Sequence, residues 1–244
     1  MWLAMYVVSE PKQMSTLLQE QFTSVFSTPR YQEVAPGVSE NSSAVNIESV
    51  VVDEDGIVKS IGCIKSGSAP GPDGIPPILL KSCADTLKAP LKTLWEKSFN
   101  LGLIPVDLKC GVIVPLHKGG SRCDVKNYRP ITLTSHLIKI FERIIAKNLV
   151  NYMEETNLFN PRQHGFRASR SCLSQLLEHY QEVLSMMETG CAADVIYLDF
   201  AKAFDKVDHG ILLRKLRAMG IGGPMLTWIQ EFLVNRSQLV SVYG

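Results

Sequence analysis

The chain has 244 residues, of which 45% are hydrophobic and 20% charged, as in an ordinary globular protein with a sizeable core. Its 25 Lys and Arg residues nearly balance 24 Asp and Glu residues, which leaves a net charge of +1. This balance excludes a protein-wide basic field of the kind that attracts nucleic acid. Any nucleic-acid surface must therefore be a local patch.

The cysteines and the start of the chain indicate a compartment. The six cysteines are scattered without a Cys-x-x-Cys pair, so neither a zinc site nor a disulfide framework is expected. The opening MWLAMYVV is apolar but too short to span a bilayer, and it lacks the basic start and the cleavage site of a signal peptide. We expect a protein of the reducing cytoplasm or nucleus, with no membrane partner.

The first part of the chain is predicted to be helical with two interruptions. Apolar residues recur at near-helical spacing over 9–27, and the Pro-, Gly- and Ser-rich stretch 27–43 has the composition of a linker. Residues 47–65 mix acidic and apolar side chains without a strict period. The stretch 65–77 holds more Gly and Pro than a helix or strand tolerates, so it predicts a loop. A helix is expected over 78–101.

A strand and two further helices are predicted next. Residues 112–116 are β-branched and are followed by two glycines, which is typical of a strand that runs into a loop. Residues 137–152 carry apolar side chains on a 3.6-residue period and predict an amphipathic helix. Another helix is expected over 173–187, after the polar loop 160–171.

The segment Val195–Phe200 ends an apolar run on a carboxylate. Both alternating sets of its side chains are apolar up to Asp199, which predicts a buried strand. An unpaired carboxylate in such a place costs on the order of several kcal/mol, so Asp199 should meet a cation, a metal or several N–H donors. These residues alone leave open whether Asp199 is a metal ligand or catalytic residue, or a capping or salt-bridged one.

The remainder of the chain is predicted to fold as two helices and a strand. Asp208 should cap the first helix. Pro224 suits the first turn of a second helix that reaches about Asn235, and QLVSVY (238–243) begins a strand with no evident sheet partner. The expected buried face of the first helix consists of Leu212, Leu213, Leu216 and Met219.

Five motifs, in the same order, resemble those of reverse transcriptases from non-LTR, LINE-type retrotransposons. YLDFAKAFDKVDH (197–209) resembles the first palm motif of these enzymes. The stretches APGPDGIPP, VIVPLHKGG, NYRPITLTS and QHGFRASRSC resemble their fingers motifs. QMSTLLQEQFTSVFSTP resembles the segment that such polyproteins carry between endonuclease and polymerase. The resemblance therefore covers nearly the whole chain.

The resemblance implies an α+β fold, the right-hand polymerase fold with helix-rich fingers and the first part of the palm. It implies an N-terminal helix and linker over 1–56 and an incomplete reverse transcriptase domain over 57–244. Within that domain, 57–170 would form the fingers and 171–244 the start of the palm. A group II intron or telomerase-like polymerase is a lesser alternative.

The implied activity is RNA-directed DNA synthesis, in which dNTPs are added to the 3′-OH of a DNA primer on an RNA template. Two Mg²⁺ or Mn²⁺ ions would assist phosphoryl transfer. Asp199 would be the catalytic, metal-binding acid, helped by the backbone carbonyl of Phe200. Lys202 and Ala203 would offer backbone N–H groups to the triphosphate. Phe204 would be the aromatic gate that excludes a 2′-OH, although a core aromatic is the alternative.

The basic residues of the loops would contact phosphates. Lys118 and Arg129 match the two fingers cations that close on the triphosphate, and plain solvent exposure is the alternative. Arg162, Arg167 and Arg170 lie in a loop without acids, which suits contacts with the template backbone; a solvated loop is the alternative. We expect Asp199 to face an open cleft with Lys118 and Arg129 on a facing lobe.

The chain contains no Asp-Asp pair, whereas the family carries a second set of acids in an aromatic-x-Asp-Asp hairpin. We therefore expect a fragment that does not polymerise DNA by itself, from a parent protein with an endonuclease upstream and the rest of the palm and a thumb downstream. A non-catalytic remnant that binds RNA or primer-template is the alternative. An unpaired edge at 238–243 would also make the chain poorly soluble or leave it locally disordered from about Gly222 onward.

Overall fold

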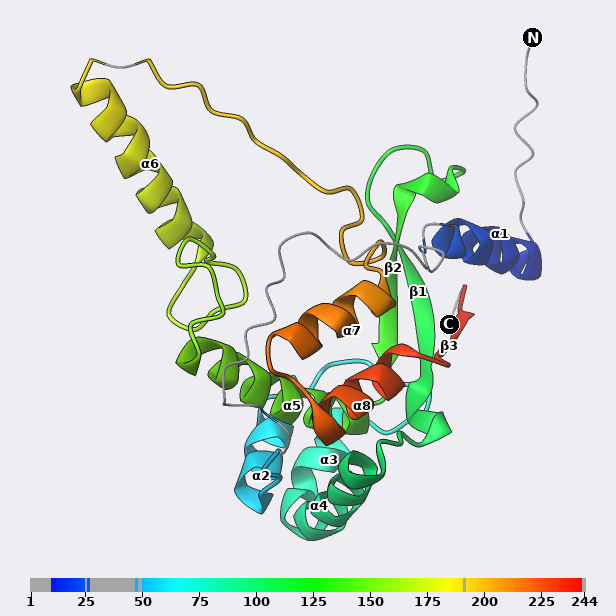
Figure 1. The fold of residues 1–244 in the computed structure, drawn as a ribbon. Helices are drawn as coiled ribbons and strands as arrows, with labels where there is room; N and C mark the ends of the chain where they lie inside the picture. The colour runs from blue at the N-terminus through cyan, green and yellow to red at the C-terminus, as the bar shows by residue number, and fades with distance from the viewer. Residues whose placement is uncertain (1–9, 25, 27–46, 48–49, 191, 243–244) are drawn as a thin grey trace. The chain divides into compact units, whose positions relative to one another are not determined.

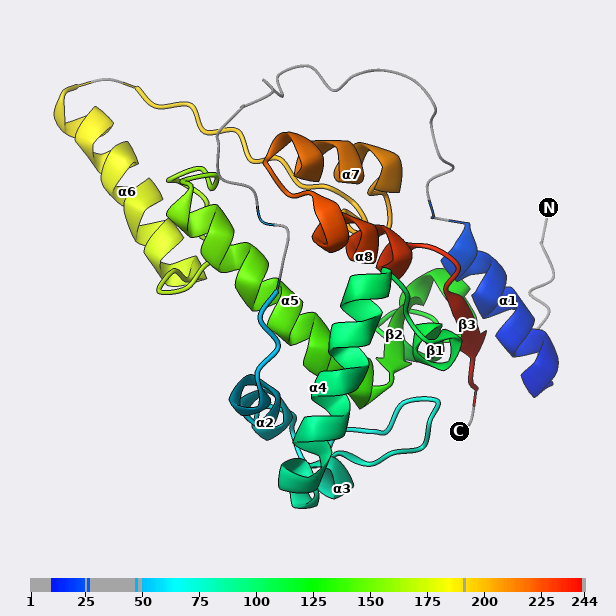
Figure 2. The ribbon, with the colours of Figure 1, turned by 60° about the horizontal axis from the view of Figure 1, so that its bottom comes forward.

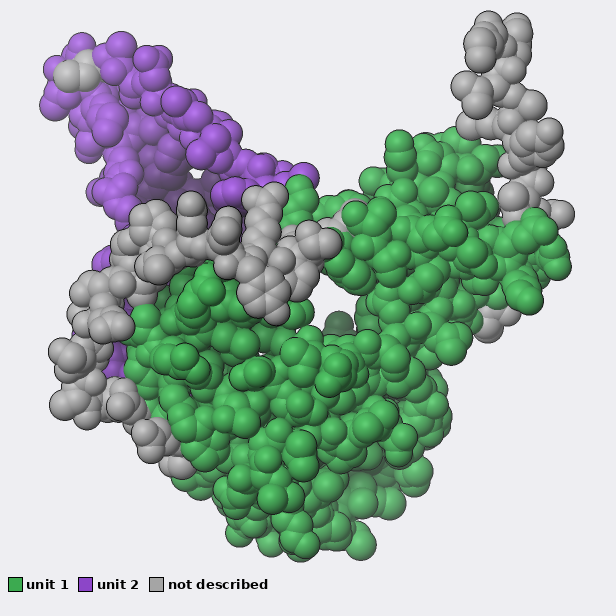
Figure 3. Space-filling view, turned by 45° about the vertical axis from the view of Figure 1, so that its right-hand side comes forward, with its two compact units in different colours: residues 1–145, 202–244 green, residues 146–201 purple. Residues whose placement is uncertain are grey.

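The computed structural model describes residues 10–24, 26, 47, 50–190 and 192–242. The expected linker over 27–43 and the apolar opening lie outside these residues. The chain divides into two compact units, one formed by residues 1–145 with 202–244 and the other by residues 146–201 (Figure 3). Among the helices of the described residues, none combines the length and apolarity of a membrane span.

Several helices of the first unit begin at a cap or a proline in the sequence. The Asp53 side chain accepts a hydrogen bond from the Gly56 N–H and so begins α2, within a stretch where no helix was predicted. The helix predicted over 78–101 is two helices, which are separated at Cys83. The bounds are α1 Pro11–Thr23, α2 Glu54–Gly62, α3 Pro77–Ser82, α4 Ala84–Leu101, α5 His136–Glu155, α7 His209–Ala218 and α8 Gly223–Leu233 (Figure 1). The last turns of α5 belong to the second unit.

Three strands form one sheet in the first unit, in the order β2-β1-β3. The central strand β1 (Cys110–His117) pairs antiparallel with β2 (Tyr128–Thr134) and parallel with β3 (Ser237–Val240). Short 3₁₀ turns, η1 (Val106–Lys109) and η2 (Val125–Asn127), precede β1 and β2. The sequence did not predict β2, which contains Pro130; an edge strand tolerates proline because its outer N–H groups need no partner.

The expected disorder from Gly222 onward and the expected lack of a partner for the last strand are wrong over residues 222–242. β3 pairs with β1 along Cys110–Ile113, and α8 buries Met225 and Trp228. The physical reason is that β1 has two edges, of which β2 occupies only one. The sequence does not reveal that a strand so distant along the chain would take the second edge.

Helix α1 covers one side of this sheet. Leu18 and Phe22 on α1 form a buried cluster with Ile113 of β1. Figure 2 shows α1 beside β3, and the two elements are in contact. The helix predicted near the start of the chain is therefore confirmed, and its apolar face holds the sheet in place.

An aromatic core joins α4, α5 and α8. The Trp95 and Phe141 rings stack with centroids 4.7 Å apart, and the Trp228 ring meets Phe141 edge-on at 5.1 Å. Lys109, almost fully buried, pairs with Glu231 through a 2.6 Å contact between Nζ and Oε1. Because Lys109 immediately precedes β1, this ion pair fixes the start of the central strand to α8.

The Pro- and Gly-rich loop before α3 is ordered and fixed to the start of α5. Ser135 Oγ donates a 2.5 Å hydrogen bond to the Asp73 carboxylate, and Nε2 of His136 lies 3.0 Å from the Ala69 carbonyl oxygen. A Cβ at Gly71 would lie 2.5 Å from the Ser135 backbone nitrogen, so only glycine fits there. The prediction of a loop is confirmed, and these contacts show that it is rigid.

The second unit contains the end of α5, the loop after it, α6 (Cys172–Glu188) and an extended segment that ends at Ala201. α6 confirms the helix predicted over 173–187. It begins with a capping box, in which Ser171 and Ser174 each accept a hydrogen bond from the other's backbone N–H. Its side chains include none that is buried.

The buried strand predicted over Val195–Phe200 does not form. Residues 192–200 take part in no ladder, and Ile196 is 83% exposed. A strand requires a neighbour to satisfy its N–H and C=O groups, and no described segment supplies one. The apolar pattern was recognised correctly, but it does not specify a pairing partner.

Candidate functional site

The β1–β2 hairpin brings Lys118 and Arg129 to one face. In the register of the ladder, Leu116 lies opposite Arg129, and the Lys118 N–H donates a 2.8 Å hydrogen bond to the Asn127 carbonyl. Leu116 and Arg129 therefore share one side of the hairpin, and the same alternation, continued one residue past the strand, puts Lys118 on that side as well. Both cations are exposed, and neither forms an ion pair within the described residues.

The connection between the two strands is held by its own hydrogen bonds. The backbone of Gly120 has φ +79, and a Cβ there would lie 2.7 Å from Nδ2 of Asn127. That amide donates a 2.9 Å hydrogen bond to the Ser121 carbonyl, and the Tyr128 hydroxyl donates a 3.0 Å one to the Arg122 carbonyl. The loop that follows Lys118 is therefore fixed by its own hydrogen bonds.

The same face of the hairpin carries exposed apolar side chains. Val114 and Leu116 on β1 and Ile131 on β2 lie on it with substantial exposure. An apolar surface with two cations at one end suits a ligand with a flat organic part and a polyanionic part. Lys supplies a mobile point charge there, and Arg supplies a planar set of donors.

Asp199 and Phe200 lie at the end of the second unit, in the extended segment, whereas Lys118 and Arg129 belong to the first. Both residues of the segment are exposed. The expectation that Asp199 is buried at the end of a strand is therefore wrong, because the sheet that would bury it does not form. The predicted cleft that would place Asp199 opposite the two cations stays a prediction.

The donors around Asp199 do not complete a metal site. Its carboxylate and the neighbouring carbonyl of Phe200 are hard oxygen ligands of the kind that Mg²⁺ prefers. Within the described residues, however, no group of three or more His, Cys, Asp or Glu side chains is placed to hold an ion. One carboxylate with one carbonyl is too small a donor set for an ion with octahedral preference.

Residues 202–206 form a tight turn in the first unit. Lys202 has a left-handed backbone with φ 53, and its carbonyl accepts a 3.2 Å hydrogen bond from the Lys206 N–H. The turn contains Ala203 and Phe204, and the triphosphate-cradling role of the Lys202 and Ala203 N–H groups stays a prediction. The Phe204 ring is 79% exposed, so the alternative of a core aromatic is not met.

Arg167, one of three arginines predicted to contact the template, is held inside the second unit. Its guanidinium donates two hydrogen bonds to the Glu154 carboxylate, at 2.9 and 2.6 Å, and lies 5.1 Å from the centroid of the Phe159 ring. This hydrogen bonding holds the pKa of Glu154 below its ordinary value. The bidentate pair indicates an anchor between the loop and α5.

Arg162 and Arg170 are placed differently. Arg162 forms an ion pair at 2.7 Å with Glu182, but its side chain is 73% exposed. Arg170 lies 3.9 Å from the Glu178 carboxylate. Exposed pairs of this kind are weak, on the order of 0–1 kcal/mol, so both arginines can exchange a carboxylate for a phosphate. The predicted set of three thus separates into one anchor and two surface cations.

His164, to which the sequence assigned no role, is a second anchor of this loop. It is buried, with Nδ1 2.8 Å from Ser174 Oγ and Nε2 2.8 Å from the Glu178 carboxylate. Ser174 and Glu178 are one turn apart on α6, so they present a pair of polar partners on one face. That spacing was a signal in the sequence, but nothing indicated that it would meet His164.

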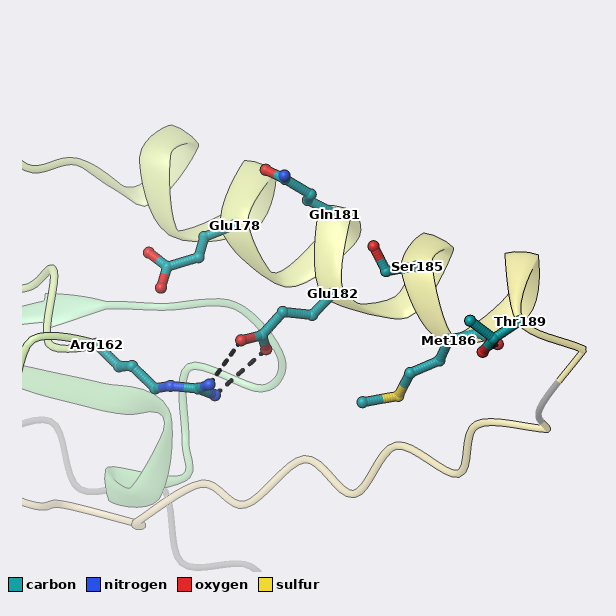
Figure 4. Close-up of a pocket in the computed structure, with 7 residues that line it drawn as sticks. All are labelled: Arg162, Glu178, Gln181, Glu182, Ser185, Met186 and Thr189. Carbon is teal, nitrogen blue, oxygen red and sulfur yellow. Dashed lines mark hydrogen bonds and ion pairs between the residues drawn. The ribbon is translucent and has the colours of Figure 1, made fainter.

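An open groove runs along α6 in the second unit (Figure 4). Arg162 reaches across the groove to Glu182. Arg162 is the one cationic side chain among the lining residues described, and it is already engaged in this ion pair. Six of the groove's seven lining residues have polar side chains, but these form no converging catalytic set. Its lining residues are Arg162, Glu178, Gln181, Glu182, Ser185, Met186 and Thr189.

Comparison with known proteins identifies the sequence. Residues 116–243 match the family described as "Reverse transcriptase (RNA-dependent DNA polymerase)". The probable RNA-directed DNA polymerase from transposon BS of Drosophila melanogaster is 26% identical over 88% of the chain and 24% of its own length. The RNA-directed DNA polymerase from mobile element jockey of the same species is 30% identical over 72% of the chain and 19% of its own length.

A third relative extends the comparison to another insect. The Pol polyprotein from the type-1 retrotransposable element R2 of Popillia japonica is 31% identical over 72% of the chain and 23% of its own length. The chain thus spans about a quarter or less of each of these relatives. The resemblance to non-LTR retrotransposon reverse transcriptases is confirmed.

Proposed function

Because the chain belongs to the reverse transcriptase (RNA-dependent DNA polymerase) family, we propose that it forms part of an RNA-directed DNA polymerase and binds the triphosphate of a dNTP on the β1–β2 hairpin. The observation that carries this proposal is the common face of Lys118 and Arg129. Both cations lie within the matched residues 116–243, and both are exposed. The whole protein would act on an RNA template and a DNA primer.

The finer assignment follows the family resemblance. The chain would supply the fingers and the first part of the palm of a right-hand polymerase. Asp199 and the Phe200 carbonyl would belong to a site for divalent ions that needs further ligands, and such ions would neutralise the reacting phosphates. The backbone N–H groups of Lys202 and Ala203 would face the triphosphate, and the exposed ring of Phe204 would select deoxyribose over ribose.

The hairpin cations contribute to phosphoryl transfer by electrostatics and positioning. The negative charge of a triphosphate is attracted to the Lys118 ammonium, while the Arg129 guanidinium can donate two parallel hydrogen bonds to phosphate oxygens. Fixed donors of this kind stabilise the charge that develops on the leaving phosphates. The exposed Leu116 and Ile131 side chains beside them offer an apolar surface to the nucleoside.

Titration of the chain with dTTP and with inorganic tripolyphosphate tests this proposal. We expect Lys118→Ala and Arg129→Ala each to weaken both ligands by about tenfold, the scale of one charge-assisted hydrogen bond. Arg129→Lys should restore only part of the affinity, because an ammonium lacks the planar fork. The matched control is Lys126→Ala, which removes an exposed lysine from η2. Equal losses in the control and the two variants would overturn the proposal.

The alternative of a non-catalytic module that binds primer-template is favoured by the incomplete donor set at Asp199. We expect the chain by itself to bind nucleotide without extending a primer, since one carboxylate cannot hold two cations about 3.5–4 Å apart. The measurement is extension of a DNA primer on an RNA template with dNTPs and Mg²⁺. Extension by the chain that disappears in Asp199→Asn would contradict this expectation and favour a complete enzyme.

A further inference from the structure

We propose that Phe166 is a base-stacking residue for single-stranded nucleic acid, presented by a loop that is locked on both of its sides. The proposal rests on the proposed function, because it names the contact that this unit would make with a template strand. Phe166 is 84% exposed, the kind of position that a large apolar ring avoids without a reason.

The backbone holds the ring outward at a conformational cost. Phe166 has φ 62, the left-handed region in which a bulky residue is an outlier. Ser169 in the same loop also has a left-handed backbone, with φ 58. Strained backbone conformations of this kind persist only where many surrounding contacts hold them in place, and they are concentrated at ligand-binding positions. An exposed aromatic ring in this conformation therefore needs both an anchor and a use.

The anchors lie within two residues of the ring, one before it and one after it. His164, two residues earlier, is buried and bonded to α6 through Ser174 and Glu178. Arg167, the next residue, is bonded to α5 through Glu154. The loop is thus fixed to two helices, and Phe166 is the residue that projects between the two attachments. A ring positioned in this way loses little further freedom when it stacks.

The charges of the loop favour nucleic acid as the partner. Residues 157–171 include three arginines and one histidine but no acid. Arg167 is committed to its anchoring pair, while Arg162 and Arg170 stay near the surface in weak pairs. An aromatic face with guanidinium groups beside it is how proteins bind single strands: the ring stacks on a base and the cations contact phosphates. An apolar protein partner would have to desolvate these cations.

Binding of fluorescent twelve-nucleotide strands to the full chain tests the proposal. The strands are RNA, DNA of the same sequence, and an abasic strand of equal length that keeps the phosphates. We expect Phe166→Gly to weaken binding of RNA and DNA by about tenfold and to leave the abasic strand unchanged, since only bases stack. Glycine is chosen because it accepts φ 62 without strain, so a loss of affinity does not report misfolding.

Two further variants separate stacking from other effects. Phe166→Trp should retain affinity and show fluorescence quenching on binding of RNA, against the background of the three native tryptophans, Trp2, Trp95 and Trp228. Phe26→Ala, which removes another exposed aromatic ring, is the control and should change nothing. If Arg162→Ala weakens all three strands while Phe166→Gly weakens none, the stacking proposal fails and the proposed nucleic-acid function survives.

Two other results would also contradict the stacking proposal. If the chain binds none of the strands, the stacking proposal fails together with the template contact of the proposed function. If Phe166→Gly leaves the affinity for each strand unchanged but abolishes self-association in sedimentation, the ring serves a protein interface and the proposal is wrong.

Discussion

The β1–β2 hairpin and the segment 195–204 contain most of the residues that the sequence assigned to catalysis, yet the structure builds them differently. The hairpin has a partner strand close by in sequence, α1 on one side and a fixed connecting loop. The segment 195–204 has an equally apolar pattern but no ladder, and its large side chains are exposed. Apolar character alone does not make a strand, because the backbone groups also need a neighbour.

This difference has a functional meaning. The geometry of Lys118 and Arg129 is set by the hairpin within its own unit. We therefore expect that triphosphate affinity at these two residues does not depend on Asp199. Asp199 has no comparable support from packing within the second unit. Pre-organised donors act strongly because they need no rearrangement, and an exposed carboxylate on an extended segment lacks that advantage.

The largest expected effect is on the free energy of unfolding, when an isoleucine is replaced by alanine in the hairpin and, for comparison, in the segment 195–204. Ile113→Ala should lower the free energy of unfolding by about 2–5 kcal/mol, because Ile113 is only 2% exposed and its removal leaves a cavity beneath α1. Ile196→Ala, at a residue that is 83% exposed, should change it by less than about 0.5 kcal/mol. Urea unfolding of the two variants measures both. Equal costs would mean that residue 196 is packed in solution, and the contrast would break down.

A smaller effect on the free energy of unfolding is expected at the start of α7, the first helix after the segment 195–204. The Asp208 carboxylate accepts a 2.8 Å hydrogen bond from the Ile211 N–H and begins α7. We expect Asp208→Ala to lower the free energy of unfolding by about 1 kcal/mol, as for other lost N-caps. The control is Asp194→Ala, which removes an exposed carboxylate from the extended segment and should be nearly neutral. A neutral Asp208→Ala would show that α7 does not depend on its cap.

The sequence was most informative where one local signal determines the result. The period over 137–152 identified α5, and Asp208 and Pro224 identified the starts of α7 and α8. It failed where a proline interrupts a strand and where a distant partner decides the pairing. β2 was missed because Pro130 argues against an interior strand, and β3 was expected to be unpaired because its partner lies more than a hundred residues earlier.

The same distinction between local signals and distant partners applies to the residues of the candidate site. The motif order led to Lys118 and Arg129, but their common face follows from the strand register, which no motif states. The arginines of the loop were recognised as basic, yet only the structure shows that Arg167 is an anchor and Arg162 a surface residue. His164 was missed because its partners lie on another element.

The smallest expected effects are changes of stability with pH. They distinguish the two units by means of two glutamates on the same helix. Glu142 and Glu154 both lie on α5, the first in the first unit and the second in the second. Burial raises the pKa of Glu142 above 4.5, against the opposing charges of Arg236 and Lys139. The hydrogen bond from Arg167 lowers the pKa of Glu154 below 4.5.

These opposite shifts give opposite dependences. A carboxyl whose pKa is raised on folding keeps a proton more readily when folded, so the contribution of Glu142 to stability falls as the pH rises from about 4.5 through the raised pKa. The contribution of Glu154 is fully present above about 4.5 and is lost as the pH falls through the lowered pKa. At pH 7 we therefore expect Glu142→Gln to stabilise the chain and Glu154→Gln to destabilise it.

Urea midpoints measured between pH 3 and pH 8 test both signs. The destabilisation by Glu154→Gln should vanish at the acidic end, and it should also vanish in an Arg167→Met background, because the two residues act as one pair. The gain from Glu142→Gln should persist in that background, since its cause is burial in the other unit. A loss of stability in Glu142→Gln at pH 7 would show that Arg236 and Lys139 outweigh the desolvation of Glu142. In that case the first unit, like the loop anchored by Arg167, would be stabilised by a charged pair rather than weakened by a buried acid.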